Sequence, residues 1–146
     1  MNFFSAIDTS ASGLSAERLR MDVISNNIAN VNTTRTESGG PFRRQLAIFQ
    51  ARKPHGNWPH TDRLNYSEPG KGVRVTAIME DQAPFKLVYD PNHPDSDKDG
   101  YVRFPNINMV HEMVDMITAT RAYEANVTCI NSAKDIINSA LGIGRR

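Results

Sequence analysis

The C-terminal segment constrains this chain most, because its apolar side chains recur at alternating spacings of four and three residues. That is the period of a coiled coil. The first stripe is interrupted only by Thr120 and Lys134 and contains Met109, Met113, Met116, Tyr123, Val127, Ile130, Ile137 and Leu141. A second stripe runs beside it through Ala119, Ala122, Cys129, Ala133, Ile136 and Ala140, with Asn126 as its polar member. A helix with two apolar faces needs neighbours on two sides, and one helix of the same chain covers only one of them.

A second long helix is predicted at the other end of the chain, from about Phe3 to about Asn32, because no proline occurs before Pro41. Its weaker stripe contains Phe4, Ile7, Ala11, Leu14, Met21 and Ile28. The two terminal helices are expected to form an antiparallel, coiled-coil-like pair. An ordinary helix pair that caps a small domain is the plainer alternative.

Between the helices, proline and glycine divide the chain into short segments with strand-like patterns. Strands are expected within residues 42–49, 72–79, 85–89 and 101–104, and together they would make one small sheet. Gln50–Gly70 is polar, contains three prolines, and is expected to form a long excursion. The predicted fold class is therefore α+β, with an N-terminal helix in residues 1–32, a β-rich and loop-rich middle in 33–105, and a C-terminal helix in 106–146.

Composition excludes several classes of function. The net charge of +1, from 17 basic and 16 acidic residues, gives no broad electrostatic surface for nucleic acid. No apolar run approaches the roughly 20 residues that span a bilayer, so membrane insertion is not expected. Residues 1–6 lack the basic and apolar regions of a Sec-type signal. Cys129 is expected to be buried within the second stripe.

No catalytic residue set is visible, so the chain is not expected to be an enzyme or to carry a cofactor. The one motif with metal-binding chemistry is Asp95-Ser96-Asp97-Lys98-Asp99-Gly100, which matches the first half of an EF-hand loop. The twelfth position, which should supply a bidentate Glu, holds Asn106, and Pro91, Pro94 and Pro105 stand where flanking helices should be. Asp95, Asp97 and Asp99 are therefore only weak metal-ligand candidates, and clustered Asp and Gly also suit an ordinary turn.

Both ends of the chain resemble a known family. Residues 12–16 (Ser-Gly-Leu-Ser-Ala) and 25–33 (Ser-Asn-Asn-Ile-Ala-Asn-Val-Asn-Thr) are similar to the N-terminal signature of flagellar axial proteins, the rod, hook and hook-associated subunits. The C-terminal half resembles the proximal rod proteins in residues 89–94, 100–102, 105–108, 112–117, 121–127 and 141–145, and residues 39–45 fit the same group. The resemblance covers roughly residues 1–49 and 85–146, and the role of residues 50–71 stays open.

The resemblance implies a structural subunit of the bacterial flagellar basal-body rod, a helical tube that transmits torque and encloses an export channel. It implies export by the flagellar type III apparatus without a Sec signal, and a location outside the cytoplasmic membrane, in the periplasm or cell wall. The implied partners are other copies, other rod subunits and the basal-body adaptor FliE.

The residues expected to form the interfaces lie on the apolar stripes or beside them. They are Ile7, Leu14, Met21, Ile28, Met113, Met116, Tyr123, Val127, Ile130, Ile137 and Leu141, together with Asn27 and Asn126. The two asparagines are expected to hydrogen-bond between helices and fix their register, as a buried Asn does in coiled coils.

Isolated helices are marginal in water, so the termini are expected to be largely disordered in the dilute subunit and to fold on assembly. A calcium-responsive adaptor that uses the Asp95–Gly100 loop is the alternative function. A small enzyme is a more distant one.

Overall fold

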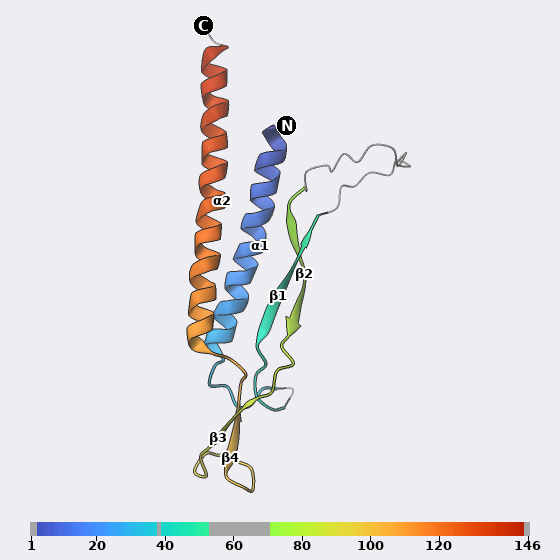
Figure 1. The fold of residues 1–146 in the computed structure, drawn as a ribbon, viewed down its shortest axis with the longest axis vertical. Helices are drawn as coiled ribbons and strands as arrows, with labels where there is room; N and C mark the ends of the chain where they lie inside the picture. Colours follow the sequence, from blue (N-terminus) through green and yellow to red (C-terminus); the bar gives the residue numbers. More distant parts are fainter. Residues whose placement is uncertain (1–2, 38, 53–70, 145–146) are drawn as a thin grey trace, which may run out of the picture.

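A computed structural model describes residues 3–37, 39–52 and 71–144 of the chain. Two long helices, α1 (Phe3–Ala29) and α2 (Met109–Ile143), lie side by side and run antiparallel, with both ends of the chain at the same end of the molecule (Figure 1). Four strands connect them, namely β1 (Gln45–Ala51), β2 (Val73–Glu80), β3 (Lys86–Tyr89) and β4 (Tyr101–Phe104). The predicted helix pair with β-structure between its members is confirmed.

Local sequence explains where each helix stops or starts. The Asn108 side chain caps α2 by accepting a hydrogen bond from the backbone N–H of Val110 at 3.0 Å. The helix therefore begins three residues after the expected position 106. The helix α1 ends at Ala29 rather than near Asn32, because the Asn30 side chain donates to the Asn26 carbonyl at 2.9 Å and the next residues form turns.

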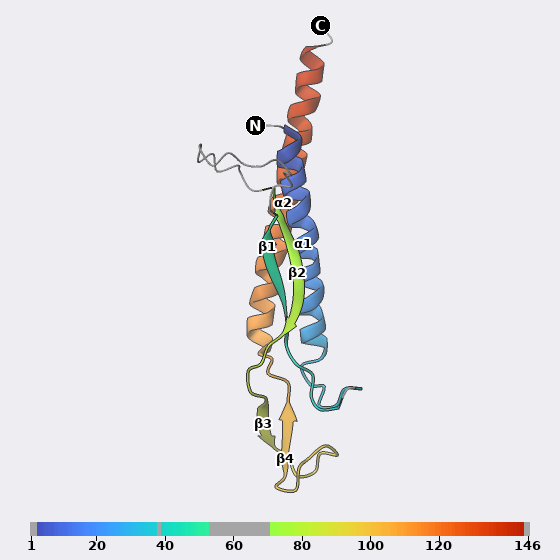
Figure 2. The same ribbon diagram turned by 90° about the vertical axis from the view of Figure 1, so that its right-hand side faces the viewer.

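The prediction of one small sheet was wrong, because the strands form two separate hairpins. β1 pairs with β2 and β3 pairs with β4, both antiparallel, and β1 contains an irregularity between Ile48 and Phe49. The segment between β2 and β3 changes direction: Ala83 N–H donates to the Asp81 side chain at 2.9 Å, and the Asn106 amide donates to the Asp81 carbonyl at 3.2 Å. This turn separates the hairpins and directs β3–β4 away from the helices (Figure 2).

The β1–β2 hairpin lies along α1, on a different side of that helix from α2 (Figure 1). The described part of the chain has a small core, whose buried apolar residues are Ala16, Val23, Ile24, Val102, Ala119 and Ala133. Neither described helix is long and apolar enough to cross a membrane. Most of the excursion predicted for Gln50–Gly70 falls outside the described residues.

Candidate functional site

The contact between α1 and α2 follows the border of the two apolar stripes of α2. The most buried positions on this helix are Glu112, Ala119 and Ala133, which are separated by seven and by fourteen residues. Gly13 of α1 packs tightly against Asn126 of α2, since a Cβ on Gly13 would lie 3.0 Å from the amide nitrogen of Asn126. Small residues thus permit a close approach of the two backbones.

The residues predicted to form the interface are therefore only partly covered by the pairing. On α1, Ile7, Leu14, Met21 and Ile28 are all half-buried. On α2, the half-buried members are Met116, Tyr123, Val127, Ile130 and Ile137, whereas Met113 and Leu141 are exposed. Each stripe keeps part of its apolar surface available to a neighbour outside the chain.

The two asparagines differ in what they contact. Asn126 donates to the carbonyl of Ala122 in its own helix at 2.9 Å, and this hydrogen bond does not cross between helices. Asn27 does cross: its amide donates to Glu112 of α2 at 3.1 Å. The same amide donates to the carbonyl of Gln45 at 2.9 Å and accepts from the N–H of Gln45 at 2.9 Å. Asn27 therefore hydrogen-bonds to both α2 and β1.

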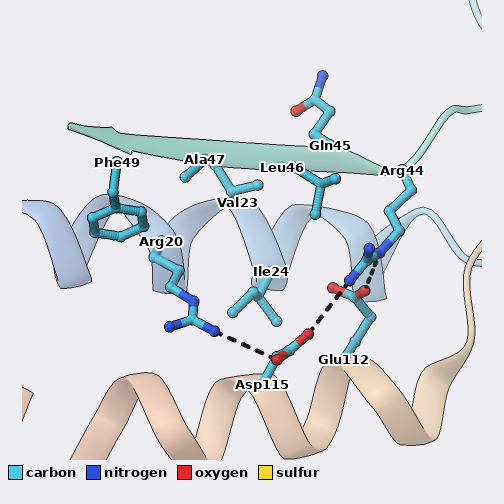
Figure 3. A pocket seen from close by; sticks show the side chains of 10 residues that line it. All are labelled: Arg20, Val23, Ile24, Arg44, Gln45, Leu46, Ala47, Phe49, Glu112 and Asp115. Atoms are coloured by element: carbon cyan, nitrogen blue, oxygen red, sulfur yellow. Dashed lines mark hydrogen bonds and ion pairs between the residues drawn. The ribbon is translucent and has the colours of Figure 1, made fainter. Parts of the chain in front are cut away.

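Four charged side chains from three segments, Arg20, Arg44, Glu112 and Asp115, lie close together (Figure 3). With Asn27, which donates to Glu112, they form what we call the Glu112 cluster. Glu112 is 0% exposed and Asn27 is 1% exposed. The Nε of Arg44 contacts Glu112 Oε1 at 2.6 Å, which is a short, charge-assisted hydrogen bond. Arg44 and Arg20 each reach Asp115 at 3.4 Å.

The position of Glu112 explains how a buried carboxylate is accommodated. Glu112 lies in the first turn of α2, where the helix dipole favours negative charge. Both of its oxygens have partners, one in Arg44 and one in Asn27. Sequence reasoning missed Glu112 and Arg44. For Glu112, the seven-residue spacing that joins it to Ala119, Asn126 and Ala133 was the signal in the sequence that could have identified it.

Beside the cluster, a hollow of about 260 Å³ opens between β1 and α2. Val23 and Ile24 of α1 form part of its lining, Leu46 and Phe49 project from β1, and the charged groups stand at its sides (Figure 3). Its lining combines apolar side chains with paired charges, since the carboxylates of Glu112 and Asp115 already contact Arg44.

The outer face of α2 carries an apolar patch near its N-terminal end, which we call the base patch: Met109, Val110, Met113, Val114 and Ile117. Val110 is 68% exposed and Ile117 is 54% exposed. Further along the helix, the corresponding outer positions are Arg121, Glu124 and Thr128. Large exposed apolar side chains on this part of the outer face thus give way to polar ones after the first turns of α2. Such a contiguous patch is typical of an interaction surface.

A second exposed apolar region lies at the other end of α2. There the helix extends beyond the first turn of α1 in both views (Figures 1 and 2). Ile136 and Leu141 are exposed, and Ile143 is 79% exposed. Cys129, expected to be buried, is exposed as well and accepts a weak hydrogen bond from the Ser10 hydroxyl at 3.3 Å.

The Asp95–Gly100 segment forms a connection between β3 and β4. Asp95 accepts from the Thr34 hydroxyl at 2.8 Å, and Asp97 faces Arg103 at 3.6 Å. Gly100 has a φ of 78° and donates to the Asp97 carbonyl at 2.8 Å, as a turn glycine does. Across the described ranges, no group of three or more His, Cys, Asp or Glu side chains is placed to hold a metal ion.

Comparison with known proteins adds the final observations. Residues 7–35 match the family model described as "Flagella basal body rod protein", and residues 98–143 match "Flagellar basal body rod FlgEFG protein C-terminal". The chain is 55% identical to the flagellar basal-body rod protein FlgC of Borreliella burgdorferi, with 98% of each chain covered. It is 41% identical to FlgC of Bacillus subtilis, over 99% of this chain and all of the relative. It is 33% identical to FlgC of Salmonella typhimurium, with the same coverage.

Proposed function

Because this chain belongs to the FlgC family of flagellar basal-body rod proteins, we propose that its terminal helices associate with neighbouring subunits to build the wall of a helical tube. Family membership makes the chain a structural, non-enzymatic component of the rod. Our proposal adds the surfaces involved and the mechanical role: the tube transmits torque from the motor and encloses the export channel.

The observation that carries this proposal is the distribution of apolar surface on α2. The α1 helix covers the border of the two stripes and leaves the base patch and the projecting end of α2 exposed. Fully burying one such side chain contributes about 1.5–3 kcal/mol. Two different apolar surfaces at opposite ends of one helix favour contacts that join unlike patches. Contacts of that kind give rings, or open helical assemblies where the rotation does not close, rather than two-fold dimers.

The proposed partners follow from family membership together with these surfaces. They are further copies of this chain, the other rod subunits and the adaptor FliE. The flagellar type III apparatus would export the subunit to the outer side of the cytoplasmic membrane. Asn27 and Asn126 would help to set how the paired helices present their outer faces, Asn27 through its bonds to α2 and β1, and Asn126 through its close packing against Gly13.

The test is a single charge placed in the base patch. Ile117→Glu replaces an exposed apolar side chain that, in our proposal, becomes buried against a neighbour. Burial of an unpaired carboxylate is costly, so we expect the variant to fold but to fail to complement a deletion strain. Swimming in soft agar and electron microscopy of isolated basal bodies provide the measurements.

Thr128→Glu is the matched control, because Thr128 is exposed on the same helix among polar outer residues. Far-UV circular dichroism of both purified variants checks that α2 is retained. Normal swimming and complete rods with Ile117→Glu would remove the base patch from the proposed interface.

A further inference from the structure

Two polar side chains of α1 hydrogen-bond to the backbone of the β1–β2 hairpin, about four helical turns apart. Asn27 binds both the N–H and the carbonyl of Gln45 in β1. Ser12 accepts from the N–H of Val73 in β2 at 3.0 Å while its hydroxyl donates to the Thr9 carbonyl at 2.7 Å. Asn27 and Ser12 are both buried, so each contact is made away from water.

The contact between Ser12 and Val73 depends on a close approach of the hairpin backbone to α1. Gly72 has a φ of 96°, and a Cβ at this position would overlap the Ser12 hydroxyl. Only glycine readily combines that backbone conformation with that proximity. Two separated points of attachment fix the direction of the hairpin along α1, whereas one point would leave it free to rotate.

Attachment of α2 is different, because its charge-assisted bonds gather at one end. Glu112 and Asp115, both near the N-terminus of α2, contact Arg44, and Glu112 also contacts Asn27. Beyond them, the side-chain hydrogen bonds between the described parts of the two helices involve sulfur acceptors. They join Thr120 to Met21 at 3.7 Å and Ser10 to Cys129 at 3.3 Å. Sulfur is a weak acceptor, so the rest of the contact between α1 and α2 depends mainly on apolar packing, around the buried Ala16, Ala119 and Ala133.

We propose that α1 and the β1–β2 hairpin form one rigid body, held by Ser12 and Asn27, and that α2 is joined to this body by a hinge at the Glu112 cluster. The angle of α2 is then adjustable in the free subunit. A hinge at the base of a helix converts a small local change into a larger displacement at its far end. The base patch lies next to the hinge, so binding there and the direction of α2 are coupled.

Distances between spin labels test this on the purified full-length chain, which separates the result from any failure of assembly. In a Cys129→Ser background, one pair of labels at Arg18 and Gln50 reports on α1 and the hairpin. A second pair at Gln50 and Ser132 reports on the hairpin and α2. All three positions are exposed. Ser132 lies between Cys129, which contacts Ser10 of α1, and the buried Ala133.

We expect a narrow distribution for the first pair and one about twofold wider for the second, as for a hinged element. Ser12→Ala and Asn27→Ala should widen the first distribution, and Glu112→Gln should widen only the second. Gly72→Ala disrupts the contact between Ser12 and Val73 from the hairpin side. It serves in place of any α1 variant that fails to fold. Asn26→Ala is the matched control and should change neither distribution.

Two results would overturn the proposal. If the distance distribution for Gln50 and Ser132 were as narrow as that for Arg18 and Gln50, and unaffected by Glu112→Gln, the angle of α2 would be fixed. A first distribution unchanged by Ser12→Ala, Asn27→Ala and Gly72→Ala would show that these contacts do not position the hairpin.

Discussion

At the scale of single residues, Asn27 illustrates how one amide can order three segments. A primary amide has two N–H donors and one carbonyl acceptor, and Asn27 directs them to Gln45 of β1 and Glu112 of α2. A carboxylate has no donors, and a hydroxyl is too short to span the same partners. Asparagine therefore suits this position because it supplies donors and an acceptor in the number and directions that Gln45 and Glu112 require.

Asn27→Asp hardly changes the size of the side chain, but it should destabilise the fold strongly. The new carboxylate would lie against the Gln45 carbonyl and within hydrogen-bonding distance of the buried Glu112 carboxylate, and both contacts would be repulsive. Introducing an uncompensated charge at such a site costs about 3–5 kcal/mol. Urea unfolding followed by circular dichroism would measure the loss in free energy of unfolding.

The neighbouring residue provides the comparison. Asn26 is exposed, and its amide reaches the Gln45 side chain only at 3.4 Å. Asn26→Asp should therefore change the free energy of unfolding by no more than about 0.5 kcal/mol. Equal losses for the two variants would contradict the role assigned to Asn27.

At the scale of elements, α2 has an anchored end and a projecting end. Near Met109 the helix is capped by Asn108 and held by the Glu112 cluster, whereas its last residues extend past α1. Helical segments without tertiary neighbours are marginal in water. The disorder expected for the dilute subunit stays a prediction. From this arrangement we expect disorder to increase along α2, from the capped end toward the projecting end.

Hydrogen exchange should reveal a gradient along α2 in the dilute subunit. We expect rapid exchange in residues 134–143 and protection in residues 112–119, because only the latter lie at the buried cluster. Incorporation into rods should slow exchange at the projecting end. Full helicity by circular dichroism at micromolar concentration, together with uniform protection and no oligomer, would contradict this.

At the scale of the whole molecule, the chain is elongated and buries little of its apolar surface. The buried apolar residues of its described part are mostly small, and larger ones such as Ile78, Leu87 and Val114 are exposed. A subunit with so small a core gains much of its stability from its neighbours.

Thermal stability should therefore depend on concentration. Association that occurs only in the folded state raises the midpoint of unfolding by mass action. We expect calorimetry over a wide concentration range to show an increasing Tm that parallels oligomer formation in sedimentation experiments. The Ile117→Glu variant should reduce the dependence. A constant Tm in the presence of oligomers would indicate that assembly contributes no stability to the subunit.

The sequence by itself determined both long helices and the approximate positions of all four strands. Those features depend on local signals: the apolar period of α1 and α2, the absence of interior proline, and alternation in segments such as Val73–Glu80. The shared motifs at the two ends also indicated the family correctly. Local periodicity and short motifs are readable without any knowledge of which segments meet.

Only the tertiary structure decided which groups meet. Both stripes of α2 are apolar, so periodicity could not show that α1 contacts the border between them. Arg44, Asn27 and Glu112 belong to three distant segments, and no local pattern indicates that their side chains form one cluster. The separation of the hairpins likewise depends on hydrogen bonds from Asn106 to a turn more than twenty residues earlier. Long-range pairing depends on the geometry of the whole fold, and that information is not contained in any single stretch of the chain.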